Sequence, residues 1–259
     1  MISCWKHRRL ERSLDDCIRC IDSAKLDKAC IVAIGINTYL AVVEWDGLDE
    51  QHCIIVPNGH YSSTIQLDEN VWDEMRIWRK GLVAMWKEQD KDCVFMEMAR
   101  DVQHGGHIFV ECIPVPQEIG DMAPIYFNVL YYNSFILFIQ KPSNIMFLCR
   151  MKAINECEGA YADTKKLIET KDLRRQIPKG FSYFAVDFGL QNGYAHAIED
   201  VSSFPATFGH EILVGMMDLP ASKWRKKEKM ELSKLRQKCE AMKKDWDKFD
   251  WTKKIERDK

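Results

Sequence analysis

The sequence contains no long uninterrupted apolar run. The apolar stretch at residues 131–149 is broken by Gln140, Lys141 and Pro142, whereas a membrane-spanning helix needs about twenty consecutive apolar residues. We therefore expect no transmembrane helix and no membrane partner. The chain also shows no internal repeat and no low-complexity linker, so a repeat array is not expected.

A signal-peptide pattern is missing too, because residues 1–9 carry charges that no apolar core follows. From this we expect a reducing, intracellular compartment, in which the ten scattered cysteines do not form disulfides. There, a C-x-x-C motif more often binds metal or carries out redox chemistry than staples the fold.

The composition is that of a folded protein. The 259 residues are 46% hydrophobic and 29% charged and include eight tryptophans, which is enough material for one large or two small domains. The net charge of −2 hides an asymmetry, since residues 223–259 hold fifteen Lys or Arg against eight Asp or Glu. A basic C-terminal segment thus follows a mildly acidic body.

Apolar periodicity predicts an α+β fold. Strand-like runs at 31–34, 39–43 and 53–56 predict an antiparallel meander, followed by a helix from about 68 to 89 and strands at 93–98 and 107–113. Asp68 is positioned to cap that helix, and Trp72, Met75, Leu82 and Trp86 recur at helical spacing, as core residues do. A second unit is predicted to contain a polar helix at 167–175, a strand pair at 181–188 and 194–198, and a buried helix at 208–219.

Four cysteine and histidine side chains have the types and order of a zinc site. Cys17 and Cys20 form a C-x-x-C motif, His60 follows one predicted strand and His107 begins another. Zinc accepts two thiolates and two imidazoles in a tetrahedron, so we predict a structural zinc ion here. The alternative is that the thiols simply pack and the histidines lie on the surface. Cys30 is a spare candidate ligand that reads more simply as strand interior, His52 is expected to be structural, and His104 is expected in a loop.

The same residues resemble the layout of a histidine triad (HIT) hydrolase. These are the early C-x-x-C, HCIIVPNGH at 52–60, and Gln103 four residues before the strand that begins at His107. The H-x-H-x-H pattern of that strand keeps only its first histidine, because Phe109 occupies the nucleophile position and Glu111 the third. Phenylalanine has no lone pair for nucleophilic catalysis, so we predict no catalytic residues. A rescue would require His104 or His196 to reach the site.

A wider resemblance covers most of residues 10–255. The motifs are ECIPVP at 111–116, GDMAPIYF at 120–127, PKG at 178–180, YFAVDFG at 183–189, AHAIED at 195–200 and WRK at 224–226. Together they closely resemble the C-terminal half of the CwfJ family. The resemblance implies an antiparallel HIT-like sheet with a long helix, followed by a second small α+β CwfJ module. We place these domains at 10–127 and 152–255.

The resemblance implies a nuclear protein of late spliceosomes that hold an excised intron lariat, with a role in lariat turnover and spliceosome disassembly. The implied partners are spliceosomal proteins, the lariat debranching machinery and RNA, either the intron lariat or small nuclear RNA. The chain departs from the family in two ways. It lacks the usual long charged N-terminal region, which suggests a fragment or an incomplete gene model. Residues 128–151 have no counterpart, which we interpret as an insertion from a translated intron.

These inferences favour a non-catalytic module that binds RNA and spliceosomal proteins. The predicted RNA contacts lie in the basic tail, whose tryptophans are expected to stack on bases: Lys226, Lys227, Lys229 and Lys234. A solvated helix with no specific partner is the open alternative for this tail. The alternative function is an active HIT-type nucleotide or RNA phosphohydrolase or transferase.

Overall fold

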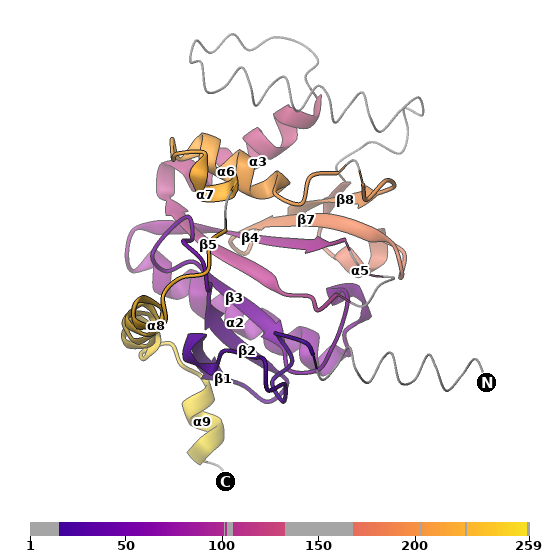
Figure 1. The fold of residues 1–259 in the computed structure, drawn as a ribbon. Helices are drawn as coiled ribbons and strands as arrows, with labels where there is room; N and C mark the ends of the chain where they lie inside the picture. Colours follow the sequence, from indigo (N-terminus) through magenta and orange to yellow (C-terminus); the bar gives the residue numbers. More distant parts are fainter. Residues whose placement is uncertain are drawn as a thin grey trace, which may run out of the picture.

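The computed structural model describes residues 16–100, 102, 106–132, 168–202, 204–225 and 227–257. Within them, eight strands form one antiparallel sheet in the order β1-β2-β3-β5-β4-β7-β8-β6 (Figure 1). The strands are β1 (Ile31–Ile34), β2 (Thr38–Val42), β3 (Cys53–Pro57), β4 (Lys91–Ala99), β5 (Val110–Pro116), β6 (Ile168–Thr170), β7 (Ser182–Phe188) and β8 (Gly193–Ile198). The predicted α+β class and the N-terminal meander are confirmed.

Helices cover both faces of this sheet. They are α2 (Glu69–Lys87), α3 (Gln117–Tyr132), α5 (Leu173–Gln176), α6 (Phe208–Met216), α7 (Ser222–Arg225), α8 (Leu232–Trp246) and α9 (Thr252–Arg257), with 3-10 turns at Lys28–Cys30 and Thr64–Gln66. One apolar core joins α2 and α8 to β1, β2 and β3, and a second lies between α3, α6 and the strands β4, β5 and β7. Among the helices described, none combines the length and the apolarity that crossing a bilayer demands.

Strands from the two predicted units form one continuous sheet. Strand β4 pairs with β5 on one side and with β7 on the other, where Val94 faces Phe188 and Ala99 faces Tyr183. The two units therefore share backbone hydrogen bonds as well as side-chain contacts. The domain boundaries at 10–127 and 152–255 stay predictions, as does the likeness to HIT proteins.

Helix α2 forms where the periodicity predicts it, and three of its four predicted core residues are buried: Met75, Leu82 and Trp86. The fourth, Trp72, is half-buried. Asp68 occupies the N-cap position without making a side-chain cap bond. Its carboxylate instead accepts a hydrogen bond from the Tyr61 hydroxyl at 3.2 Å, so the predicted capping interaction is wrong even though the helix boundary is right.

Three other local predictions need correction. The final strand of the first unit begins at Val110, because the Ile108 amide donates to the Tyr61 carbonyl (2.7 Å) before the ladder starts. The polar helix expected at 167–175 is a short strand, β6, followed by the single turn α5. Cys30 ends a 3-10 turn rather than lying inside a strand. Most of the predicted insertion at 128–151 lies outside the described residues, as do Gln103 and His104.

The basic tail packs against the body through an apolar stripe. Leu235, Cys239, Met242 and Trp246 recur at helical spacing on α8, and all are buried. The Trp246 ring lies 5.5 Å from that of Trp78 on α2. The expectation that the tail tryptophans stack on bases is therefore wrong for Trp246, whose ring is part of the core.

Gly81 permits this close approach of α2 and α8, since a Cβ atom there would lie 2.5 Å from the end of the Trp246 ring. Alanine is the better helix former by about 1 kcal/mol. We nevertheless expect Gly81→Ala to lower the free energy of unfolding by about 1–3 kcal/mol, because the buried ring has no room to move. Urea unfolding measures the change.

Gly215→Ala is the matched control, because its Cβ would meet no atom within 4 Å at the end of α6. That variant should be neutral or slightly stabilised. Equal effects of the two substitutions would show that the contact between Gly81 and Trp246 does not limit the helix spacing.

Candidate metal centre

Three separate segments bring the four predicted zinc ligands together. Cys17 and Cys20 lie in the loop before the first 3-10 turn, His60 follows β3, and His107 precedes β5. Their ligand atoms all lie within 4.8 Å of one another. The Cys20 Sγ atom is 3.4 Å from Nδ1 of both His60 and His107, and Cys17 Sγ is 3.4 Å from Nδ1 of His107. Tetrahedral zinc with ordinary bond lengths separates sulfur and nitrogen by about 3.6 Å, so the spacing suits this ion.

The backbone around the tetrad orients its ligands. Nε2 of His107 lies 3.1 Å from the Pro57 carbonyl, which can only accept a hydrogen bond. The imidazole proton is therefore on Nε2, and the Nδ1 lone pair faces the thiols. This is the arrangement in which a second hydrogen bond fixes the tautomer of a metal-ligating histidine. The Arg19 amide also donates to Cys17 Sγ at 3.4 Å.

Burial shifts the pKa values of two of the ligands. Desolvation, followed by the adjacent Cys17 thiol, raises the pKa of Cys20 to about 12. Desolvation and the neighbouring His60 lower the pKa of His107 to about 4, so its imidazole is neutral at physiological pH. A divalent cation acts on the thiols in the opposite direction, because coordination stabilises the thiolate. The donor set of two thiols and two imidazoles thus fits zinc.

Cys30, the spare candidate ligand, does not belong to this tetrad. Its buried thiol donates to the Asp27 carbonyl at 2.9 Å.

The two degenerate triad positions, Phe109 and Glu111, follow His107 along the chain and have partners outside the tetrad. The guanidinium of Arg19, inside the C-x-x-C motif, lies 5.3 Å from the centre of the Phe109 ring. Glu111 is buried, and its Oε2 atom lies 2.7 Å from Nε2 of His210 and 3.2 Å from Nε2 of His52. The Lys227 ammonium lies 3.8 Å from the other carboxylate oxygen. We call Glu111, His52, His210 and Lys227 the Glu111 cluster.

Two observations argue against a metal ion in this cluster. The Leu48 amide donates to Nδ1 of His52 (3.3 Å), so Nε2, which faces Glu111, carries the proton and has no lone pair to offer. The Lys227 ammonium also supplies a positive charge where a cation would have to bind. The cluster is therefore best described as a buried carboxylate whose charge is balanced by neighbouring side chains of the same chain.

Electrostatics in the cluster favour the ionised carboxylate. Burial alone would raise the pKa of Glu111, but His210, His52 and Lys227 outweigh it and hold the pKa well below its usual value. The pKa of His52 is lowered to about 4 by its complete burial, which the carboxylate only partly offsets. A carboxylate with three such partners is fixed in place.

His210 is not among the site residues predicted from the sequence. The histidines expected to reach the triad face in a rescue were His104 and His196. His104 lies outside the described residues, and His196 on β8 stacks on Phe204 at 5.5 Å and belongs to neither cluster. The sequence does contain one indication of its role. His210 lies within the predicted buried helix at 208–219, and a buried histidine requires a polar partner.

The predicted RNA contacts in the tail have different surroundings. Lys234 is exposed on α8, and Lys229 is largely exposed and forms an ion pair with Asp27 at 3.5 Å. Lys227 faces the body, with its ammonium 4.5 Å from the centre of the Trp45 ring as well as near Glu111. Lys226 lies outside the described residues. The tail therefore offers fewer unengaged cations than its sequence suggests.

Comparison with known proteins identifies the chain. Residues 5–128 match a family model described as "Protein similar to CwfJ C-terminal", and residues 160–252 match "Protein similar to CwfJ C-terminus 2". The chain is 62% identical over 253 residues to the CWF19-like protein 2 homolog of Caenorhabditis elegans, covering 98% of this chain and 50% of that protein.

More distant relatives agree with this assignment. Human CWF19-like protein 2 is 38% identical over 250 residues, with 96% of this chain and 25% of that protein covered. Pre-mRNA-splicing factor cwf19 of Schizosaccharomyces pombe is 25% identical over 257 residues, covering 95% of this chain and 36% of that protein. The chain thus spans half or less of the length of these relatives. It belongs to the family of proteins similar to CwfJ in their C-terminal part.

Proposed function

We propose that this chain is a non-catalytic module of a nuclear pre-mRNA-splicing factor and acts at the late, intron-lariat stage. The name of the fission-yeast relative supports the role in splicing. The observation that carries the non-catalytic part is the chemistry of the degenerate triad face. There, Phe109 supplies no nucleophile, and the carboxylate of Glu111 is already engaged by His52, His210 and Lys227.

The space at that face also argues against catalysis. The cavity bounded by Phe109, Glu111 and His210 has a volume of about 30 Å³. Ligand sites for nucleotide-sized molecules are about ten times larger or more. A nucleotide could not reach Glu111 or His210 without rearrangement of α6, which carries His210.

We further propose that the tetrad of Cys17, Cys20, His60 and His107 holds a structural zinc ion. The support is the 3.4 Å spacing of sulfur and nitrogen atoms and the proton on Nε2 of His107. Such an ion would tie three segments of the first unit together. It would supply folding energy and no chemistry, because all four of its ligands come from the protein.

The proposed partners are spliceosomal proteins, the lariat debranching machinery, and intron lariat or small nuclear RNA. In the tail we assign RNA contact to Lys226, Lys227, Lys229 and Lys234. The exposed Lys234 and Lys229 are the best supported, whereas contact through Lys227 competes with its position beside Glu111.

Recovery of RNA from nuclear extract tests this proposal. We expect the purified chain to recover intron lariats and late spliceosomal proteins. Combined substitution of Lys226, Lys229 and Lys234 by glutamine should lower RNA recovery and flatten its salt dependence, since each lost phosphate contact removes counterion release. Lys227 is left unchanged so that the Glu111 cluster stays intact.

The matched control replaces three exposed lysines outside the tail by glutamine: Lys28, Lys87 and Lys179. Equal recovery by both variants would assign the tail to a solvated helix, and recovery of no spliceosomal RNA would count against the proposal as a whole. Turnover of a dinucleoside polyphosphate or capped RNA that Glu111→Gln abolishes would favour the alternative, an active phosphohydrolase or transferase.

A further inference from the structure

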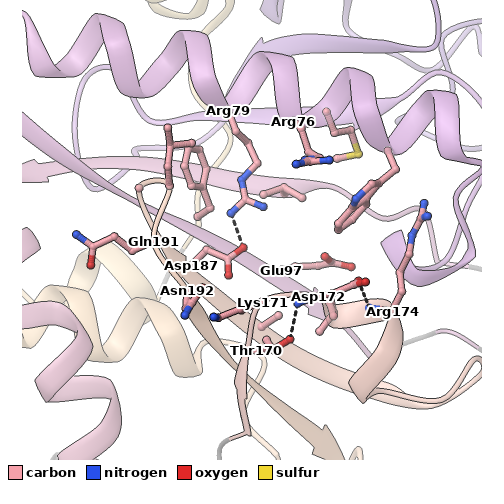
Figure 2. A pocket seen from close by; sticks show the side chains of 18 of the residues that line it. Arg76, Arg79, Glu97, Thr170, Lys171, Asp172, Arg174, Asp187, Gln191 and Asn192 are labelled. Carbon is pink, nitrogen blue, oxygen red and sulfur yellow. Dashed lines mark hydrogen bonds and ion pairs between the residues drawn. The ribbon is translucent and has the colours of Figure 1, made fainter.

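A large cleft lies apart from the tetrad and the Glu111 cluster. Its volume is about 600 Å³, within the range of ligand-binding sites. Helix α2 forms one wall, β6 and α5 form the opposite wall, and the turn at 189–192 between β7 and β8 closes one end (Figure 2). No residue of the tetrad or the Glu111 cluster lines it.

Basic side chains face each other across this cleft. Six Lys or Arg residues line it, against four Asp or Glu residues. Arg76, Arg79 and Lys80 come from α2, where Arg76 lies one turn before the other two. Lys171 and Arg174 come from the opposite wall (Figure 2). A cleft with cations on both walls attracts an anionic chain that passes between them.

Two of these cations are fixed parts of the walls. Arg79 forms an ion pair with Asp187, and its guanidinium lies 4.4 Å from the centre of the Phe95 ring. Arg174 donates to the Leu67 carbonyl at 3.0 Å, and its guanidinium lies 4.7 Å from the centre of the Trp72 ring. These contacts hold flat, π-rich groups at the edge of the cleft.

Lys80 and Lys171 differ from the fixed arginines. Both are exposed and line the cleft, and neither forms an ion pair with any residue that the structure describes. Their ammonium groups are therefore available to an incoming anion. Glu97, a buried acid that lines the cleft, accepts hydrogen bonds from the Thr64 amide (3.0 Å), the Thr64 hydroxyl (2.7 Å) and the Tyr183 hydroxyl.

We propose that this cleft binds single-stranded RNA, with phosphates at Lys80 and Lys171 and a base against Trp72 and Arg174. The proposal rests on the RNA contact assigned under the proposed function, and it names a second surface for it. Single-stranded RNA presents unstacked base faces to aromatic and guanidinium planes, which a duplex does not.

An acidic peptide is the competing class of ligand, and the end of the cleft argues against it. Gln191 and Asn192 line that end with amide groups that both donate and accept hydrogen bonds. Base edges also present both donors and acceptors, whereas carboxylates only accept. The combination of cations, a π surface and amides therefore matches a nucleotide better than an acidic side chain.

Fluorescence anisotropy with a labelled oligouridine of about eight nucleotides tests the proposal. The double variant Lys80→Gln, Lys171→Gln should bind about tenfold more weakly than the wild-type chain near physiological salt. The slope of log affinity against log salt should become shallower by about 1.4, because two phosphate contacts on a single strand are lost. Both lysines are exposed, so the melting temperature should not change.

The control variant Lys87→Gln, Lys179→Gln removes the same charge from exposed positions outside the cleft and should leave affinity within about twofold. The tail variant, with glutamine at Lys226, Lys229 and Lys234, is measured in the same assay. If it weakens binding while the cleft double variant does not, the cleft inference fails and the proposed RNA contact of the tail survives. Absence of oligouridine binding by the wild-type chain would overturn both. Displacement of the RNA by a glutamate-rich peptide of equal charge would overturn RNA as the ligand.

Discussion

Replacement of Cys20 by serine is expected to release zinc and to lower the free energy of unfolding by at least about 4 kcal/mol. Cys20 Sγ lies 3.4 Å from Nδ1 of both histidines of the tetrad, so this substitution removes a donor atom that is close to both imidazoles. For a chain of this size the loss corresponds to a fall in melting temperature of about 8–16 °C. Elemental analysis of protein purified without chelator, together with thermal unfolding, measures both effects.

The large effect follows from where the ligands come from. Cys17 and Cys20 have little regular structure of their own, and His60 and His107 lie in the segments that enter and leave the central strands. A metal bound only by the folded chain adds its binding free energy to the stability of the fold. A strong chelator should therefore destabilise the wild-type chain about as much as the substitution does.

Cys239→Ser is the matched control for metal content. Cys239 is a buried thiol whose Sγ donates to the Ile31 carbonyl at 3.2 Å, and it is not a member of the tetrad. This variant should keep one zinc per chain. Wild-type protein without stoichiometric zinc, or a Cys20→Ser variant with an unchanged melting temperature, would contradict the assignment.

Much of the fold could be predicted from the sequence because its signals are local. The meander and α2 follow from apolar residues at periods of two and 3.6. The predictions failed where tertiary contacts override those periods. His107 and Ile108 bond to Pro57 and Tyr61 before the ladder begins, so β5 starts later than its pattern suggests. The Asp68 carboxylate accepts from Tyr61 instead of capping its own helix.

The two side-chain clusters differ in how far the sequence could identify them. The tetrad consists of a C-x-x-C motif and of histidines at the ends of predicted strands. Their residue types and positions in the sequence are enough to predict that they form one site. The Glu111 cluster requires His210 and Lys227, about a hundred residues further along the chain. The pairing of β4 with β7 and a β-bridge between Trp45 and Lys229 bring that part of the chain close. The cleft is similar, because its walls come from α2, β6, α5 and the turn at 189–192.

Substitution of Glu111 by glutamine should lower the free energy of unfolding by about 3–5 kcal/mol at neutral pH. The side chain keeps its size and loses its charge, which leaves Lys227 without its buried counter-ion. Glu118→Gln on α3 is the control, since that carboxylate is exposed and should contribute less than about 0.5 kcal/mol. Urea unfolding at pH 7 measures the difference.

The dependence of stability on pH provides a second, independent test of the cluster. The folded-state pKa of Glu111 is held well below the unfolded value, so its contribution is present above the unfolded pKa and is lost as pH falls through the folded one. His52 titrates near 4 when folded and near 6.5 when unfolded. Between these values the unfolded chain binds more protons, so stability rises with pH.

In the Glu111→Gln variant the stabilising contribution of the ionised Glu111 carboxylate disappears. The difference in stability between wild type and variant should therefore shrink as the pH falls below the unfolded-state pKa of the carboxyl group. The rise in stability that His52 causes between about pH 4 and 6.5 should remain in both proteins, because burial is its main cause. A stability difference that stays constant from pH 7 down to acidic pH would mean that Glu111 acts through its shape and not through its charge.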